Sequence, residues 1–467
     1  MSIRITACYL YVIFFAWMAR RAWYISLCAA VALMAVIQHP DMPKNVMDIQ
    51  GFNPWNLLFG SVLICWLLHR SRHGWRWEAP GYVTFLLLAY LAVVLLSVAR
   101  YVFNPTAWYG DTFMNVISEY LINCLKWTLP GILFLDGTRS RRHVLFAIVA
   151  ILAVYVLLSV QVIRWVPFGS GSGKAARYIQ NEIGYNRVTL SMMLSGASYG
   201  VLATLLLVSR WKHKLLIILA GLGVIYAQAV TGGRSGYVSW IVVGFILCVV
   251  RWRKFLPLIP VALVAIVAFV PGVKERVLQG FGDKDAQIVV TTDEYEMTSG
   301  RNLAWPAVIE QIQKGPFIGY GREAMYTTGV QTFLLEEHGE SFPHPHQAYL
   351  EVLLDMGLLG FVVIMPFYLV VLYQAFRLVQ DRADPLVVVV GTMCFSMVLA
   401  LMVASLGGQT FYPREGAVGL WAAIGLMFRV ALERRRQPDG LLFVEEEAAD
   451  DVIELEVDPD ENPRFAN

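Results

Sequence analysis

The chain has 467 residues, of which 57% are hydrophobic and 15% are charged, and its formal net charge is +2. Its mean hydropathy of +0.56 lies far above that of soluble proteins. Apolar runs long enough to cross a hydrocarbon core of about 30 Å recur along the sequence, which excludes a soluble protein. The sequence contains no nucleic-acid-binding motif. The composition therefore predicts an all-α polytopic membrane protein with about 12–13 transmembrane helices.

The chain begins with two short apolar segments, which indicate either two spans or a half-inserted hairpin. This choice decides between thirteen and twelve full spans. No cleavable signal peptide is expected, because the first segment has no small-residue cleavage site. The predicted spans cover about residues 6–18, 22–37, 55–69, 81–99, 115–135, 144–165, 187–208, 214–230, 236–250, 255–272, 357–376, 385–405 and 416–432.

Lysine and arginine fall in alternate connections between these spans. Because such residues are enriched in cytoplasmic loops, the alternation predicts the topology. The basic connections, near residues 20–21, 70–76, 139–142, 210–214, 251–254, 377–382 and 434–436, are predicted to be cytoplasmic. The opposite, periplasmic face then receives residues 38–54, 100–114, 166–186, 231–235, 273–356 and 406–415.

Four regions follow from this topology. Residues 1–272 hold the N-terminal transmembrane helices, and 357–436 hold the C-terminal ones. Between them, 273–356 form one large periplasmic loop, in which an amphipathic stretch near 301–314 predicts a helix on the membrane surface or over a cavity. The last region, 437–467, is strongly acidic without periodicity, which predicts a disordered cytoplasmic tail. All six cysteines fall in predicted spans, so neither a disulfide framework nor a thiolate metal site is expected.

Several arginines lie on the face where the charge rule does not place them. Arg187 opens a span, Arg234 lies in a glycine-rich turn, Arg301 begins the amphipathic stretch, and Arg414 follows Phe-Tyr-Pro. A planar guanidinium suits phosphate oxygens, and glycine lets a ligand approach the backbone. We therefore predict that all four bind an anionic or glycan group of a substrate. The alternatives are a lipid phosphate contact for Arg234 and an ion pair with residues 293–296 for Arg301.

The segment 344–360 leads from the loop into a long span. On a helix beginning near His346, Tyr349 lies on the same face, so both side chains can point into one cavity. An imidazole can take a proton from a sugar hydroxyl near neutral pH, which predicts that His346 is catalytic and that Tyr349 binds substrate. The alternative is that His346 only caps the helix. Glu351 and Asp355 are expected to face protein or water, because contact with lipid is costly.

These residues resemble the motifs of the bacterial O-antigen ligases and polymerases. Residues 346–360, with His-Gln, nine residues and Gly-Leu-Leu-Gly, resemble the family's histidine motif. The turn 231–236 resembles its short glycine–arginine turn. Residues 299–321 resemble its loop signature, a Trp-containing helix followed by Pro-x-x-Gly-x-Gly, and residues 186–187 resemble the start of an earlier span.

The resemblance implies a metal-independent, cofactor-free glycosyltransferase of the bacterial inner membrane with its active site facing the periplasm. Its donor is then a glycan on undecaprenyl diphosphate, and its acceptor is a sugar hydroxyl on lipid A-core, on another lipid-linked repeat or on protein. His346 is implied as the base and the arginines as ligands of the diphosphate. Membrane lipids are expected partners and nucleic acid is not. The alternative is a transporter or flippase of lipid-linked oligosaccharide, against which the sequence shows no inverted repeat.

Overall fold

The structure is a computed structural model that describes residues 3–44, 51–104, 108, 112–170, 172–261, 264 and 301–443. Within these residues the chain is helical and contains no β-strand, which confirms the all-α prediction. Eight of the described helices are long and apolar enough to cross a membrane. The protein is therefore a multi-pass membrane protein, as its composition predicts.

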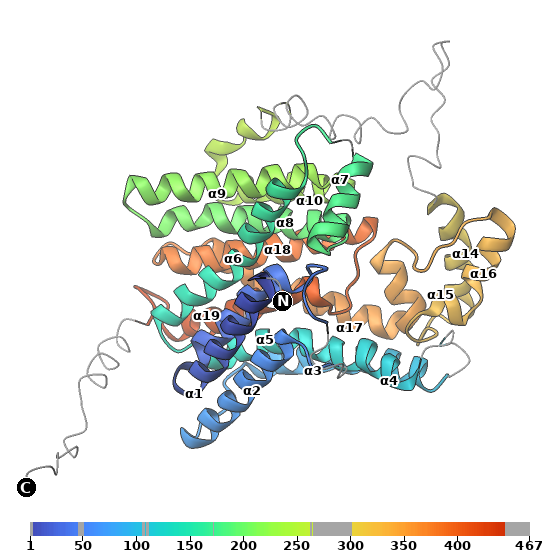
Figure 1. The fold of residues 1–467 in the computed structure, drawn as a ribbon, viewed down its shortest axis with the longest axis horizontal. Helices are drawn as coiled ribbons and strands as arrows, with labels where there is room; N and C mark the ends of the chain where they lie inside the picture. Colours follow the sequence, from blue (N-terminus) through green and yellow to red (C-terminus); the bar gives the residue numbers. More distant parts are fainter. Residues whose placement is uncertain are drawn as a thin grey trace, which may run out of the picture.

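The helices form one bundle with a small lobe beyond one of its ends (Figure 1). The lobe consists of α14 (Arg301–Lys314), α15 (Ala324–Thr327) and α16 (Val330–His338). The short helices α4 (Phe113–Val116) and α7 (Ser172–Tyr178) are not part of the lobe. The bundle consists of α1 (Ile3–Ile37), α2 (Pro54–Arg72), α3 (Gly81–Val102), α5 (Asn123–Gly137), α6 (Arg141–Trp165), α8 (Arg187–Ala203), α9 (Trp211–Val230), α10 (Arg234–Val250), α17 (Ala348–Val379), α18 (Pro385–Ala404) and α19 (Val418–Arg436).

The helices coincide with the predicted spans from 6–18 to 236–250 and from 357–376 to 416–432. The span predicted at 255–272 lies mostly outside the described residues, as do residues 293–296. The first two predicted spans both belong to α1, which changes direction at Ala22, where the backbone is not helical. Its two halves pack against each other, since the Tyr11 hydroxyl donates to the carbonyl of Ala29 at 2.9 Å.

The centre of the bundle is α18, which is buried over most of its length. Asp384 starts the helix by accepting a hydrogen bond from the Leu386 amide at 2.9 Å, and proline follows directly as the first helical residue. Small residues then let neighbouring helices approach it. A Cβ atom on Gly196 of α8 would lie 2.6 Å from the Met397 Cα of α18, so only glycine permits this contact.

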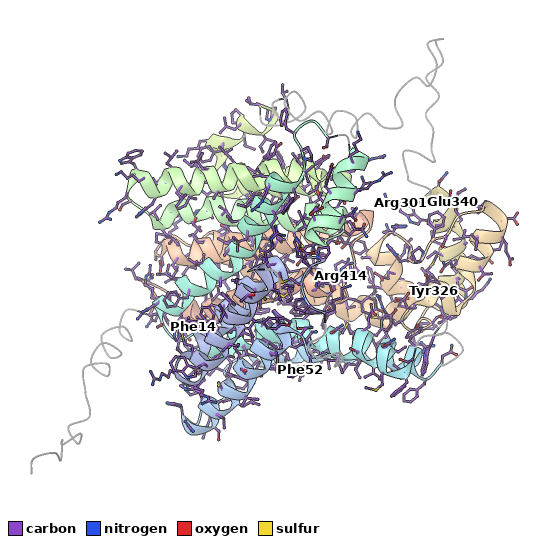
Figure 2. All side chains as sticks on the ribbon, in the orientation of Figure 1. Phe14, Phe52, Arg301, Tyr326, Glu340 and Arg414 are labelled. Atoms are coloured by element: carbon purple, nitrogen blue, oxygen red, sulfur yellow. The ribbon has the colours of Figure 1, made fainter. Side chains whose placement is uncertain are left out.

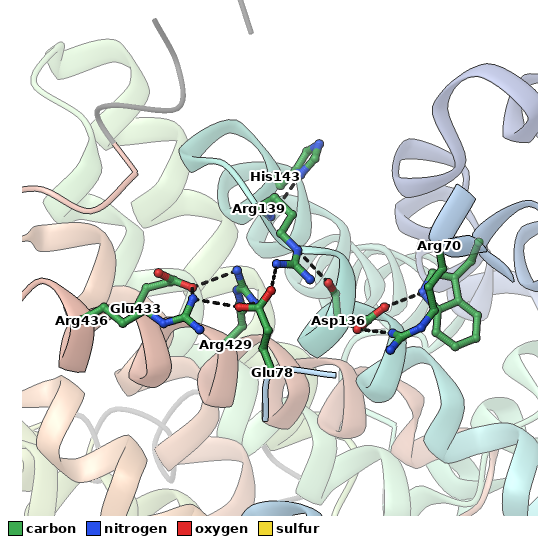
Figure 3. A network of polar contacts seen from close by, with 9 residues as sticks. Arg70, Glu78, Asp136, Arg139, His143, Arg429, Glu433 and Arg436 are labelled. Carbon is green, nitrogen blue, oxygen red and sulfur yellow. Dashed lines mark hydrogen bonds and ion pairs between the residues drawn. The ribbon is translucent and has the colours of Figure 1, made fainter. Parts of the chain in front are cut away.

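Ion pairs join the helices at the end of the bundle opposite the lobe (Figure 3). Glu78, at the start of α3, accepts hydrogen bonds from Arg139, from Arg429 at 3.1 Å and from Arg436 at 2.8 Å. Glu433 pairs with Arg429 at 2.8 Å on the same helix. We call this end the basic end and the end that carries the lobe the loop end.

Two further pairs extend the contacts at the basic end. Arg141 binds Asp384 with both terminal nitrogens, at 2.7 and 3.1 Å, and Arg434 pairs with Asp381 at 2.8 Å. The predicted basic connections 70–76, 139–142, 251–254 and 434–436 supply the basic partners there, and the connection 377–382 supplies carboxylate and carbonyl acceptors. Their gathering at one end agrees with the predicted alternation of connections.

The first residues of the predicted tail are packed against the bundle. The Leu442 amide donates to the Asp384 carboxylate at 3.1 Å, and the side chains of Leu442 and Phe443 are buried. The chain up to Phe443 is therefore part of the helical body, because two apolar side chains that precede the acidic residues are buried against it. The rest of the predicted disordered tail, 444–467, lies outside the described residues.

The two ends of the bundle predict opposite labelling by a membrane-impermeant thiol reagent. Glu337→Cys on α16 is expected to react in intact spheroplasts, because the charge rule places the loop end in the periplasm. Lys212→Cys, in the first turn of α9, is expected to react only after lysis. Both side chains are exposed, and the native cysteines are first replaced. Labelling of position 212 but not 337 in intact spheroplasts would reverse the assigned orientation.

Candidate active site

The segment 405–414, between α18 and α19, forms the base of the candidate site. The Tyr90 hydroxyl of α3 donates to the Phe411 carbonyl at 2.6 Å. The Tyr412 hydroxyl donates to Asp355 of α17 at 2.8 Å and lies 2.9 Å from the Ser97 hydroxyl of α3. Buried bonds to two different helices therefore fix the backbone of this segment.

His346 lies beside this segment and outside any helix. Its backbone is left-handed, with φ of 54°, and α17 begins only at Ala348. The prediction that His346 and Tyr349 share one helical face is therefore wrong. The alternative that His346 caps the helix is also wrong, because the N-cap residue of α17 is Gln347. Instead, the indole of Trp305 on α14 donates to the Pro345 carbonyl at 3.0 Å and so holds the turn that carries the imidazole.

Arg301 and Arg234 reach the same place from two other elements. The Arg301 guanidinium donates to the Gly407 carbonyl at 2.9 Å, and its Nε is buried without a hydrogen-bond partner among the described residues. A Cβ on Gly407 would lie 2.9 Å from the Cβ of Ser235, next to Arg234. A Cβ atom on Gly408 would lie 3.7 Å from Nδ1 of the His346 imidazole. The structure thus brings Arg234, Arg301 and His346 together around two consecutive glycines; we call these three residues the arginine–histidine cluster.

The electrostatics of the cluster favour an anion and a neutral imidazole. Burial and the nearby charge of Arg234 lower the pKa of Arg301. Burial, His344 and the charge of Arg301 lower the pKa of His346 from its ordinary 6.5 to about 4. His346 is therefore an uncharged proton acceptor at neutral pH, and the two guanidiniums repel each other until an anion lies between them.

The glycines of the turn before α10 serve helix packing as well. The Ser195 hydroxyl of α8 donates to the Gly236 carbonyl at 2.8 Å, and a Cβ on Gly233 would lie 2.7 Å from the Cβ of Ser191. Arg187 is the first residue of α8, one turn before Ser191. It therefore starts the helix that packs against the Arg234 turn. Among the described residues, no hydrogen bond or ion pair between Arg187 and the cluster is seen.

Tyr349 and Arg414 lie apart from the cluster. The Tyr349 hydroxyl donates to the Met402 carbonyl at 2.8 Å and its ring packs on Phe411, so Tyr349 fastens α17 to α18. Arg414 is partly buried and donates to Gln409 at 3.3 Å. Burial lowers its pKa, which the carboxylate of Glu351 partly offsets. In Figure 2 Arg414 lies where the bundle meets the lobe, whereas Arg301 lies on the lobe itself.

A buried charged group that the sequence argument missed lies beneath the histidine turn. Arg322 donates to Glu351 at 2.9 Å and lies 3.6 Å from Asp355 and 3.4 Å from Glu323. Its guanidinium also stacks on the ring of Tyr412, 3.8 Å from the ring centre. Glu351 and Asp355 thus face protein, as predicted. The available signal for Arg322 was its position directly after the Gly-Tyr-Gly of the loop signature.

A polar cavity of about 240 Å³ opens next to this group. Its wall includes Arg322, Glu351, Asp355, His344, Gln409 and Arg414. The predicted residue Arg414 therefore belongs to this cavity, whereas Arg234 and Arg301 do not line it.

The two longest sequence motifs dock on each other beside the cavity. The amides of Tyr320 and Gly321 donate to the carbonyls of Leu354 and Asp355 at 2.9 and 2.8 Å. In the other direction, the amides of residues 358 and 359 donate to the carbonyls of residues 316 and 317. This exchange requires α17 to break at Gly357, where φ is 65° and ψ is −163°. A Cβ there would lie 2.5 Å from the backbone of Phe317.

Comparison with known proteins agrees with this geometry. Residues 216–365 match the O-antigen ligase family, a range that includes α10, the lobe and the first half of α17. The chain carries an O-antigen ligase domain. This confirms the resemblance seen in the motifs, and it implies an enzyme of the ligase or polymerase type that acts on lipid-linked glycans. No curated protein matches the sequence.

The break in α17 predicts a specific sensitivity of this O-antigen ligase domain. Gly357→Ala is expected to destabilise the protein by about 1–3 kcal/mol, the cost of holding a side chain in a backbone region that favours glycine. Thermal unfolding in detergent and limited proteolysis of residues 315–347 would measure it. Gly60→Ala on α2 is the control, because a Cβ there meets nothing within 4 Å. Equal unfolding midpoints for both variants would show that the break does not require glycine.

Proposed function

We propose that the protein transfers a glycan from undecaprenyl diphosphate to a sugar hydroxyl at the periplasmic face of the inner membrane. The observation that supports this most is the arginine–histidine cluster, in which three elements distant in sequence place two guanidiniums beside a neutral imidazole. Glycosyl transfer from a diphosphate donor needs positive charge to stabilise the leaving group and a base to deprotonate the nucleophile. The acceptor is a sugar hydroxyl on lipid A-core or on a second lipid-linked glycan.

Arg234 and Arg301 bind the diphosphate of the donor in this proposal. When the bond between the anomeric carbon and the diphosphate oxygen breaks, negative charge grows on that oxygen. Two partly buried guanidiniums stabilise this charge more in the transition state than in the ground state, which is what accelerates the step. The Nε of Arg301, buried without a partner among the described residues, is one available donor. We propose that Arg187 assists from the start of α8.

His346 accepts the proton of the acceptor hydroxyl. The acceptor oxygen forms a bond to the anomeric carbon, its proton passes to the imidazole, and undecaprenyl diphosphate leaves with the bonding electron pair. A base acts only when it is deprotonated, and the lowered pKa of His346 keeps it so near neutral pH. The arginines carry the charge that a divalent cation carries in many other glycosyl transfers, so we propose that no metal is needed.

Conservative substitutions of the cluster test this function. Arg234→Lys keeps the charge but loses the planar fork, so donor KM is expected to rise strongly. His346→Gln is expected to lower kcat by about 10²- to 10⁴-fold with little change in donor binding. Transfer between purified lipid-linked substrates is measured in excess EDTA, with Arg382→Lys and His338→Gln as exposed controls. Near-normal kcat for His346→Gln, or an absolute requirement for added Mg²⁺ or Mn²⁺, would contradict the mechanism.

The pH dependence of transfer follows from the pKa of His346. Since the free base is active, kcat/KM of the free enzyme is expected to stay level as pH falls from 7 and to decline only near pH 4. A bound diphosphate offsets the positive charge of Arg301, so the acidic decline of kcat should lie at higher pH than that of kcat/KM. Rates measured between pH 4 and 8 give both profiles. Coincident declines above pH 6 would show that another group is the base.

A further inference from the structure

The polar cavity at the loop end contains a hydrogen-bond donor that the described residues do not satisfy. The Nε2 of Gln409 is buried and has no hydrogen-bond partner among the described residues. Its Oε1 accepts the hydrogen bond from Arg414 at 3.3 Å, and this is the one contact that fixes the amide. Gln409 is 3% exposed, so solvent does not compensate for the missing bond. Both side chains line the cavity, and a ligand with acceptor oxygens would complete them.

The charges around the cavity select against an anionic ligand. Two arginines, Arg322 and Arg414, line the cavity together with three acids, Glu323, Glu351 and Asp355. Glu351 and Asp355 already pair with Arg322. The cavity therefore has no excess of positive charge. Guanidinium and amide donors next to carboxylate acceptors suit a group that both donates and accepts, as a sugar hydroxyl does.

The position of the cavity relates it to the base. His344 and Gly408 both line it. The rings of His344 and His346 have centres 4.2 Å apart, and a Cβ on Gly408 would lie 3.7 Å from His346 Nδ1. A molecule in the cavity therefore lies next to two neighbours of His346, while Arg301 contacts the adjacent Gly407. Arg234 and Arg301, which bind the donor in the proposed function, do not line the cavity.

We propose that this cavity binds an uncharged sugar residue of the acceptor, the one that presents its hydroxyl to His346. Gln409 and Arg414 donate to its hydroxyl oxygens, and Glu351 accepts from its hydroxyl groups. This assignment rests on the proposed glycosyl transfer. It adds that the acceptor, rather than the donor, enters this cavity, and that the acceptor's sugar is uncharged. A volume of about 240 Å³ accommodates one monosaccharide rather than a longer chain.

Gln409→Leu tests the assignment, because it removes the amide but keeps an apolar side chain of similar length. Acceptor KM is expected to rise about three- to tenfold, the effect of one lost hydrogen bond, while donor KM stays unchanged. Gln374→Leu is the matched control, since Gln374 is also buried but lies near the other end of α17. Equal acceptor KM values for the wild type and a folded Gln409→Leu would overturn the proposal.

Direct binding gives a second measurement that does not depend on transfer. Saturation-transfer NMR on the full chain in detergent uses methyl β-glucoside, methyl β-galactoside and methyl β-glucuronide as probes. At least one neutral glycoside is expected to bind the wild type and to lose binding in Arg414→Gln, whereas the glucuronide binds at least tenfold more weakly. Preferential binding of the glucuronide, or no dependence on Arg414, would overturn the proposal. Gln409-dependent binding of a neutral glycoside without any glycosyl transfer would instead contradict only the proposed function.

Discussion

The exchange of backbone hydrogen bonds at Gly357 is the constraint on which the loop end depends. A straight α17 would satisfy the carbonyls of Leu354 and Asp355 within the helix and leave the segment 316–321 without partners. The break frees these carbonyls for the loop, and in return the loop carbonyls satisfy the amides of the next turn. Because a buried backbone group without a partner is costly, loop and helix hold each other in one register. That register places Arg322 within ion-pair distance of Glu351 and Asp355.

This register also explains how residues far apart in the sequence form one site. The loop that follows the docked segment returns to α17 through the histidine turn, and the Trp305 indole holds that turn from the lobe. The segment 405–414 is bound from beneath by α3 and α17. Each catalytic candidate therefore sits on a backbone fixed by other elements, so the geometry of the cluster does not depend on the substrate. Preorganisation of this kind is what electrostatic stabilisation of a leaving group requires.

Sequence patterns predicted the helices and named all three members of the arginine–histidine cluster as candidate site residues. They did not predict the left-handed backbone of His346 or the contacts of Tyr349. The length of the apolar runs predicted the helices, because a helix must be long and apolar enough to cross the hydrocarbon core. The alternation of basic connections predicted which connections lie at the same end of the bundle. Tyr349 could not be placed, since its position follows from where α17 begins, and His346 lies two residues before that helix with a left-handed backbone. Arg322 was missed because its partners lie about 30 residues away, across a contact that only the break at Gly357 creates.

The ion pairs at the basic end bear on how the chain is assembled. Glu78 is synthesised early, whereas two of its partners, Arg429 and Arg436, lie on α19 and are synthesised much later. Before α19 is made, Arg139 is the partner of Glu78 that is already present. Once α19 inserts, its arginines share Glu78 with Arg139, and Glu433 of the same helix offsets part of their added charge. The insertion of α19 therefore completes the ion-pair network at the basic end.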